Sequence, residues 1–227
     1  MTQVAGIRAR NRAAIEAEIQ RAASEHLATY GAAGLSLRAL ARELGMASSA
    51  IYRYVDSRDE LLTRLIVAAY DSLGDAAESA LEARPGATPA QGFRVIAHAV
   101  RDWARARPHE YALIYGSPVP GYHAPPERTV DAGTRVPRLL IGVLAGLESH
   151  AAATPLEDRA FGHMLADPVF AGSGLTSGTL HRGLAAWTLV LGAITTELFE
   201  QFGTEALPDP DAFFDAILED AELLVTR

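Results

Sequence analysis

The sequence contains no cysteine and no lysine, and it has no long hydrophobic run. The lack of cysteine excludes disulfides and thiolate metal sites. The longest apolar stretch, near residues 184–194, is too short to cross a bilayer and is interrupted by Thr188 and Gly192. No apolar segment follows the N-terminal arginines, so we expect no secretory signal. These absences favour a cytoplasmic protein that makes no contact with membranes.

Sequence signatures of enzymes are also missing. The segment 174–178 carries its hydroxyls at the wrong offset for a nucleophile elbow, and Gly172 and Gly174 do not extend into a dinucleotide-binding motif. The seven histidines form neither an H-x-x-x-H pair nor an H-E-x-x-H set, so their spacing does not indicate a metal site. We therefore expect no enzymatic activity, no cofactor and no bound metal.

Composition and charge favour a two-part globular chain. Of the 227 residues, 49% are hydrophobic and 21% are charged, which is enough apolar material for a sizeable core. The formal net charge of −8 is unevenly distributed: residues 1–65 carry nine arginines against seven acidic residues, and the remainder carries eleven against twenty-one. An acidic body does not prevent a mildly basic head from binding DNA, because charges beyond about 10 Å are largely screened at 0.1 M salt.

Nearly every segment has the periodicity of an α-helix, and no sustained strand-like alternation occurs. Glycine, proline and capping residues divide the chain, and Ser57 with Glu60 predicts a capping box at the start of a long helix. The sequence therefore predicts an all-α protein. The expected helices cover approximately residues 15–30, 37–44, 47–55, 57–84, 89–107, 111–115, 128–149, 157–166, 180–202 and 210–225.

The first three expected helices have the pattern of a helix-turn-helix unit, in which the last short helix enters the major groove. Ser36 is a good N-cap for the first short helix, and Gly45 is expected to end it. In the next helix, Ile51 and Val55 are one turn apart and should face the core. The opposite face carries hydroxyl, phenol and guanidinium groups that suit DNA, from Ser48, Ser49, Tyr52 and Arg53.

The segment 34–62, GLSLRALARELGMASSAIYRYVDSRDELL, strongly resembles the signature of TetR-type repressors. The resemblance implies that the residues at Ser36, Ser48, Ser49, Tyr52 and Tyr54 touch DNA. Arg58 replaces the usual lysine that holds a phosphate, and Val55 replaces a customary phenylalanine. Tyr54 could also lie partly in the core, and Arg38 or Arg42 could occupy a solvated face. The expected DNA-contacting residues are Ser36, Arg38, Ser48, Ser49, Tyr52, Arg53, Tyr54 and Arg58.

The last two helices carry apolar residues that favour a homodimer. The helix near residues 180–202 has two apolar stripes, so one side could face its own body and the other a partner. A palindromic operator requires two heads on a two-fold axis. The alternative is that both helices only complete the core of a monomer. The expected interface residues are Leu184, Leu191, Ile194, Leu198, Phe214, Ile217, Leu218 and Leu224.

The body also resembles the TetR C-terminal domains named for a Trp-His-Gly signature, in residues 108–121 and in the helix from Trp187 to Gly192. The expected histidine is Leu191 here, so any role of that imidazole is lost. The resemblance implies a small-molecule effector that releases the DNA. Such a pocket combines aromatic and apolar side chains with a few polar ones, although aromatic residues of this kind more often belong to the plain core than to a pocket wall. The candidates are Trp103, Tyr111, Tyr115, His123 and Trp187.

Together these features predict a DNA-binding head over residues 1–56 and a ligand-binding and dimerisation body over residues 57–227. The expected function is a transcriptional repressor that leaves a palindromic operator when an effector of unknown identity binds. An all-α small-molecule-binding protein, or an enzyme without a DNA-dependent function, is the alternative.

Overall fold

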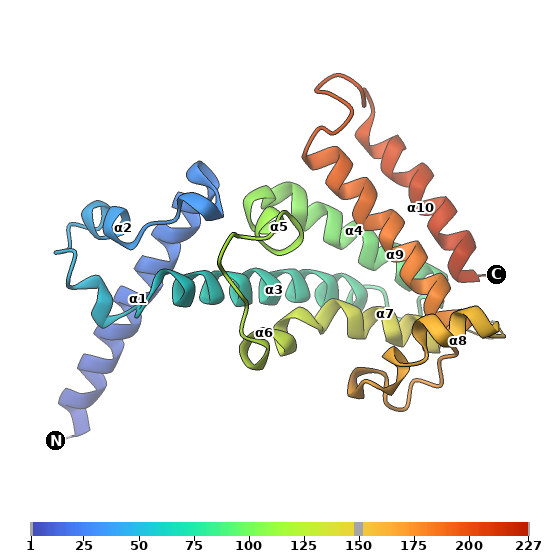
Figure 1. Ribbon diagram of the computed structural model, residues 1–227, viewed down its shortest axis with the longest axis horizontal. Coiled ribbons are helices and arrows are strands. Elements are labelled where there is room, and N and C mark those ends of the chain that lie inside the picture. The colour runs from blue at the N-terminus through green and yellow to red at the C-terminus, as the bar shows by residue number, and fades with distance from the viewer. Residues whose placement is uncertain (1, 148–151, 227) are drawn as a thin grey trace. The chain divides into compact units, whose positions relative to one another are not determined.

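The computed structural model describes residues 2–147 and 152–226, which form helices and loops with no β-strand in these ranges (Figure 1). The expected all-α fold class is confirmed. None of the described helices is long and apolar enough to span a bilayer. The α-helices are α1 (Thr2–Tyr30), α2 (Leu37–Glu43), α3 (Arg58–Glu82), α4 (Pro89–Ala106), α5 (Pro108–Tyr115), α6 (Pro126–Gly133), α7 (Arg135–Ala145), α8 (Pro155–Phe161), α9 (Ser177–Leu198) and α10 (Pro210–Thr226). The 3-10 helices are η1 (Ala32–Gly34), η2 (Ile51–Arg53), η3 (Met164–Ala166) and η4 (Pro168–Phe170).

The chain folds into two compact units, each built from two segments. The first unit comprises Met1–Ser72 and Arg107–Gly133, and the second comprises Leu73–Ala106 and Thr134–Arg227. Helix α3 contributes its first part to the first unit and its last part to the second. This division differs from the expected boundary at residue 56, because the start of α3 and the segment 107–133 pack with the head.

The core of the first unit explains why the head does not end at residue 56. Leu61 and Leu62 of α3 are fully buried in the same cluster as Leu40 of α2 and Ile51 of η2. A head without the first turns of α3 would leave this cluster open to water on one side. The buried members of the cluster are Ile19, Ala22, Ala23, Leu35, Leu37, Leu40, Ala41, Ile51, Val55, Leu61, Leu62 and Leu65.

In the second unit, α9 and α10 lie side by side and also pack on α4 (Figure 1). Both helices were expected from their apolar periodicity, over residues 180–202 and 210–225. One face of α10 is buried, and its members are spaced three or four residues apart as one helical face requires. These members are Phe214, Leu218, Ala221 and Val225.

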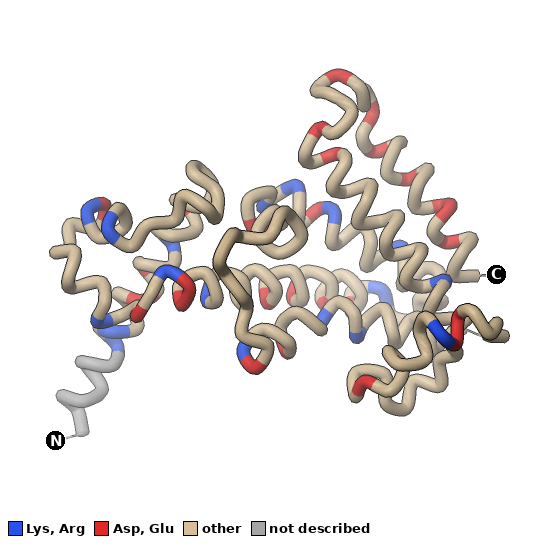
Figure 2. The backbone as a smooth tube through the Cα atoms, viewed as in Figure 1, with Lys and Arg blue, Asp and Glu red and all other residues tan. Residues whose placement is uncertain are grey.

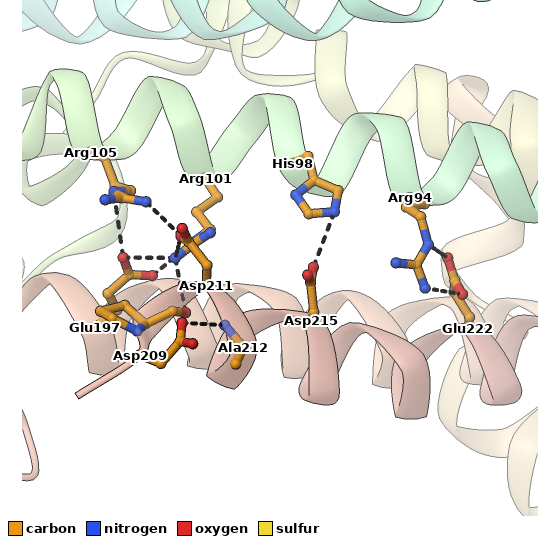
Figure 3. Close-up of polar contacts among 11 residues, drawn as sticks. Arg94, His98, Arg101, Arg105, Glu197, Asp209, Asp211, Ala212, Asp215 and Glu222 are labelled. Atoms are coloured by element: carbon orange, nitrogen blue, oxygen red, sulfur yellow. Dashed lines mark hydrogen bonds and ion pairs between the residues drawn. The ribbon is translucent and has the colours of Figure 1, made fainter. Parts of the chain in front are cut away.

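A row of side-chain ion pairs along α4 joins this helix to α9 and α10 (Figure 3). Arg94 pairs with Glu222 through two hydrogen bonds of 2.6 and 2.7 Å. Arg101 is buried and donates to the Glu197 carboxylate at 2.7 and 3.1 Å. A guanidinium tolerates burial only when its charge and its donors are matched in this way. Arg101 also pairs with Asp211 and donates to the Pro210 carbonyl, and Arg105 pairs with Asp211 and Glu197. His98 Nε2 lies 3.4 Å from an Asp215 carboxylate oxygen.

One expected helix is divided in the structure. The sequence predicts a single helix over residues 128–149, whereas α6 ends at Gly133 and α7 begins at Arg135. Pro137 provides the physical reason, because it has no N–H to donate to the carbonyl of Gly133 and its ring would clash with that carbonyl in a continuous helix. Proline is tolerated in the first turn of a new helix, where Pro137 lies. Of the expected helix, residues 148 and 149 lie outside the described residues.

Candidate nucleic-acid interface

The first short helix of the helix-turn-helix unit begins where the sequence predicts. Ser36 has an extended backbone (φ −138°, ψ 116°), and its Oγ accepts a hydrogen bond of 3.4 Å from the backbone N–H of Ala39. This contact identifies Ser36 as the N-cap of α2. Because the hydroxyl oxygen accepts this bond, the hydroxyl proton of Ser36 is still available to a phosphate oxygen.

The turn between the two short helices depends on Gly45. Its φ of 64° lies in the left-handed region, which glycine adopts without the steric cost of a Cβ atom. Gly45 N–H donates to the Arg42 carbonyl at 3.2 Å, and Met46 N–H donates to the Ala41 carbonyl at 2.8 Å. These two bonds form a Schellman motif, which satisfies the last carbonyls of α2. The expected end of α2 at Gly45 is confirmed.

The segment 47–55 is wound more tightly than expected. The sequence predicts an α-helix, whereas the structure has a turn followed by the short 3-10 helix η2. The backbone N–H groups of Ala50, Arg53 and Tyr54 each donate to the carbonyl three residues earlier. Only Val55 makes the four-residue bond, to Ile51 at 3.0 Å. A segment this short makes few hydrogen bonds for the backbone freedom it loses, so packing decides its geometry.

The two faces of this segment differ in the way that the sequence predicts. Ile51 and Val55 are at most 1% exposed and belong to the core of the head. Ser48, Ser49 and Arg53 are exposed, and Tyr52 is 45% exposed. Burial on one side therefore presents two hydroxyls, a phenol and a guanidinium together on the other side. This is a set of donors that fits phosphates and base edges.

Tyr54 and Arg38 have different surroundings. Tyr54 is half-buried against the head core, and the guanidinium carbon of Arg12 lies 5.7 Å from the centre of its ring. This distance is within cation–π range and places a basic side chain of α1 over Tyr54. Arg38 is exposed on α2, where Figure 2 also shows basic positions, whereas acidic positions recur along α10. Arg12 was not among the expected site residues, because nothing in its local pattern marks this tertiary contact.

Arg58 has a structural role that sequence reasoning missed. Its Nε donates to the Leu35 carbonyl at 3.1 Å and its Nη2 donates to the Ala32 carbonyl at 2.8 Å. Nη1 lies 3.8 Å from an Asp59 carboxylate oxygen, and 33% of the side chain is exposed. The guanidinium therefore ties the start of α3 to the linker between α1 and α2. A phosphate contact by Arg58 stays a prediction, and it would have to be made by a side chain that already holds the head together.

The start of α3 shows half of the expected capping box. Ser57 Oγ accepts a hydrogen bond of 3.0 Å from the Glu60 backbone N–H, as predicted. The Glu60 carboxylate accepts hydrogen bonds from Arg128 of α6 and, at 2.7 Å, from Arg64. The hydrogen bond from Arg128, helped by that from Arg64, holds the pKa of the Glu60 carboxyl below its usual range. The tertiary partner Arg128 explains why this carboxylate faces away from the cap.

The five expected effector-binding residues have unequal exposure. Tyr111 is fully buried, and Trp103 is 3% exposed. Tyr115 and Trp187 are half-buried, whereas His123 is exposed. In the first unit, the rings of Tyr111 and Tyr115 have centroids 5.1 Å apart, and the Tyr70 ring meets Tyr115 edge-on at 6.5 Å. Burial raises the pKa of the Tyr115 phenol, with help from the neighbouring tyrosines, so this group is neutral at pH 7.

The expected dimer residues divide into two groups. Ile194, Phe214 and Leu218 are fully buried within the single chain, so their side chains have no exposed surface left for a partner to cover. They pack the core of the second unit, since α9 and α10 bury this face against their own chain. The other five are half-buried: Leu184, Leu191, Leu198, Ile217 and Leu224.

Two exposed leucines were missing from the expected interface. Leu189 of α9 is 38% exposed and Leu223 of α10 is 47% exposed. Leu189 belongs to the second of the two apolar stripes on this helix, which the sequence shows but without indicating which stripe faces outward. The members of this stripe are Ala185, Leu189, Gly192, Thr196 and Phe199. Among the described residues, no group of three or more histidine or acidic side chains is placed to hold a metal ion.

Comparisons with known proteins agree with this description. The bacterial regulatory proteins of the tetR family match residues 19–65, and tetracyclin repressor-like C-terminal domains match residues 93–221. The HTH-type transcriptional regulator Rv1816 of Mycobacterium tuberculosis is 43% identical over 210 residues, which cover 89% of this chain and 88% of that protein.

Solved structures show the same fold. The crystal structure of SCO4313, a protein proposed to be regulatory, has a TM-score of 0.78 at 35% identity and covers 93% of this chain and 97% of that chain. The TetR family transcriptional regulator PfmR from Thermus thermophilus has a TM-score of 0.54 at 17% identity over 91% of this chain and 96% of that chain, which shows the fold alone.

The N-terminal match spans the helix-turn-helix unit, and the C-terminal match spans α5 to α9 together with most of α4 and α10. The tetR family and the relative Rv1816 are named as transcriptional regulators, which confirms the expectation that this chain is not an enzyme. The chain belongs to the TetR family of DNA-binding transcriptional regulators.

Proposed function

We propose that the chain is a homodimeric repressor that binds a palindromic operator and releases it when a small molecule binds its C-terminal body. The observation that carries the DNA-contact assignment is the polarity of residues 47–55, where Ile51 and Val55 are buried and Tyr52 and Arg53 are exposed. The exposed side would enter the major groove. The proposed contacts are Ser36, Arg38, Ser48, Ser49, Tyr52, Arg53, Tyr54 and Arg58.

The proposed dimer forms through the outward faces of α9 and α10. Exposed leucines on both helices support this proposal, because an exposed apolar face on paired helices is stabilised when a second copy covers it. A two-fold axis through such a face brings two heads to two half-sites that lie about one helical turn or a multiple of it apart. The proposed interface contains Leu184, Leu189, Leu191, Leu198, Ile217, Leu223 and Leu224.

The proposed effector binds among the aromatic side chains of the body. The tyrosine cluster around Tyr111 and Tyr115 supports this proposal, because neutral phenols in apolar surroundings provide both contact area and directed hydrogen bonds. His123 belongs to the same unit as these tyrosines, whereas Trp103 and Trp187, the other two candidates from the sequence, belong to the second unit. The effector would act as a population shift, by favouring the dimer whose recognition segments no longer fit successive grooves.

The DNA assignment is tested on a duplex that the wild-type chain selects from a random library. We expect Tyr52→Ala to weaken binding of this duplex by about tenfold or more, since a good base contact is worth about 1–3 kcal/mol. Tyr30→Ala is the matched control, because Tyr30 is 63% exposed but lies outside the proposed contacts. Equal binding by wild type and Tyr52→Ala would contradict the assignment.

The effector proposal has a direct optical test, since the chain contains two tryptophans, Trp103 and Trp187. A screen of small aromatic and aliphatic compounds should identify one that changes the intrinsic fluorescence and lowers affinity for the selected duplex. Trp187→Phe leaves Trp103 as the only reporter and assigns the signal. A compound that releases the duplex without changing the fluorescence of either tryptophan would place the effector elsewhere.

A further inference from the structure

Residues 107–133 follow α4 in the sequence, yet they belong to the same compact unit as the helix-turn-helix head. Leu113, Val119 and Tyr122 from this segment pack against the head core, which contains Leu61 and Leu62 of α3. We infer that residues 116–128, which we call the strap, position the DNA-contacting surface without touching DNA themselves. Tyr122 and Arg128 are its positioning residues. This inference rests on the operator binding proposed above.

The first contact of the strap is a buried hydrogen bond. The Tyr122 hydroxyl lies 2.9 Å from Thr63 Oγ1, and Thr63 is 2% exposed. Thr63 Oγ1 donates its only proton to the Asp59 carbonyl at 2.9 Å, so Tyr122 must be the donor between the two hydroxyls. Tyr122 therefore donates and Thr63 accepts, and this hydrogen bond holds the strap against the second turn of α3.

The second contact is ionic and acts on the first turn of α3. Arg128 donates through Nη1 to Glu60 Oε2 and through Nη2 to Oε1, the latter at 3.3 Å. Arg64 donates to the same carboxylate at 2.7 Å. Two guanidinium groups thus hold a single carboxylate, and the fork of Arg128 fixes its direction as well as its distance. The strap itself is braced at this point, because Thr129 Oγ1 donates to the Pro125 carbonyl at 3.0 Å.

The residues that the strap holds lead directly to the DNA-contacting surface. Glu60 lies two residues after Arg58, which donates to the Ala32 and Leu35 carbonyls. Leu35 in turn precedes Ser36, the N-cap of α2. The contacts therefore form a continuous route from the strap, through the first turns of α3, to the start of α2. A shift in the strap would be transmitted to the helix-turn-helix by bonded neighbours rather than through solvent.

If the strap acts through these contacts, its variants should lose affinity for the selected duplex without losing the fold. The full-length variants Arg128→Gln and Tyr122→Phe should keep the wild-type fold, because each retains most of its side-chain volume. Together they should weaken binding of the selected duplex by about tenfold, while binding of a scrambled duplex changes by less than about twofold. Arg128→Lys keeps the charge and should recover part of the loss. Arg159→Gln is the matched control, since Arg159 is an exposed arginine of the second unit.

A double-mutant cycle identifies the partner through which Arg128 acts. In a Glu60→Gln background, Arg128→Gln should cause little further loss of selected-duplex affinity, because both changes remove the same interaction. Fully additive losses, or equal losses for the selected and scrambled duplexes, would overturn the inference. If the combined variant does not fold, the single variants and Arg128→Lys decide the same question. A wild-type chain that selects no duplex would overturn the proposed operator function too, whereas a selected duplex that all variants bind equally would overturn only this inference.

Discussion

The guanidinium of Arg58 donates a hydrogen bond of 2.8 Å to the carbonyl oxygen of Ala32, which ties the start of α3 to the linker that precedes α2. A second bond to Leu35 makes this side chain part of the head's internal structure. In TetR-type repressors this position is expected to hold a phosphate. Replacing Arg58 would therefore change two quantities at once, the stability of the head and its affinity for DNA.

We expect Arg58→Ala to lower the free energy of unfolding by about 2 kcal/mol, because hydrogen bonds from a charged donor contribute about 1.5–3 kcal/mol each and the site is partly exposed. Urea denaturation measures this change. Arg38→Ala, on the exposed side of α2, is the control and should stay within about 0.5 kcal/mol of the wild type. Identical unfolding midpoints for Arg58→Ala and Arg38→Ala would show that the carbonyl contacts contribute nothing.

Arg53→Ala tests whether the exposed guanidinium of the recognition segment meets a phosphate. Removing one phosphate contact should reduce the slope of log affinity against log salt concentration by about 1, with little change in thermal stability. Fluorescence anisotropy between about 50 and 200 mM salt, a range over which phosphate contacts change the affinity strongly, provides the comparison. Arg159→Ala, far from the head in sequence, should leave the slope unchanged. If the Arg53→Ala slope matches the wild type, Arg53 does not neutralise a phosphate.

Local features of the head could be predicted from the sequence because they depend on neighbours in the chain. Gly45 has a left-handed backbone, as a helix-ending glycine should, and Ile51 and Val55 are buried at one-turn spacing. The tight winding of residues 47–55 was not predicted, since packing and not propensity sets a single turn. The division at Thr134 does not follow from the apolar periodicity of residues 128–149, because that periodicity is blind to Pro137, which is the third residue of the new helix.

Tertiary contacts account for most of what the sequence did not indicate. The pairing of Arg101 with Glu197 joins residues of α4 and α9, and no local spacing identifies such partners. The outward face of α9 was ambiguous for another reason. The sequence of a helix that is apolar on two sides does not show which side its own chain covers. In the structure, Ile194 is buried and Leu189 is exposed.

Arg101→Met should destabilise the second unit strongly. The substitution leaves the Glu197 carboxylate, 10% exposed, without its principal counter-charge, and breaking a buried pair costs about 3–5 kcal/mol. Arg105→Met is the matched control, because the Arg105 side chain is 47% exposed and its pairs should contribute less than about 1 kcal/mol. Thermal and urea unfolding of both variants give the comparison. Equal losses would mean that burial does not distinguish the two arginines.

The acid dependence of stability should include a contribution from Glu60. Arg128 and Arg64 lower the pKa of this carboxyl in the folded chain, so its stabilising effect is complete above the unfolded value of about 4.3 and is lost as the pH falls through the folded value. Glu60→Gln should therefore be less stable than wild type at pH 7, by less than about 1 kcal/mol because both partners are at least partly open to solvent, and the difference should shrink towards pH 3. Urea midpoints across this range measure it. A difference that grows on acidification would refute the proposed charge pairing.

The last prediction concerns the outward face of α9 and α10, which is the proposed dimer interface. Leu223 is 47% exposed on α10, and a charge at this position would have to be desolvated in a dimer that buries it. Leu223→Glu should therefore shift the full-length chain from dimer to monomer in sedimentation velocity without lowering its helix content. Leu156→Glu is the matched control, because Leu156 is 66% exposed on α8 and lies outside the proposed interface. A single head makes half of the contacts that a palindromic duplex offers, so Leu223→Glu should also lose most of its affinity for the selected duplex. A Leu223→Glu chain that remains dimeric at the concentrations where wild type is dimeric would place the two-fold axis on another surface.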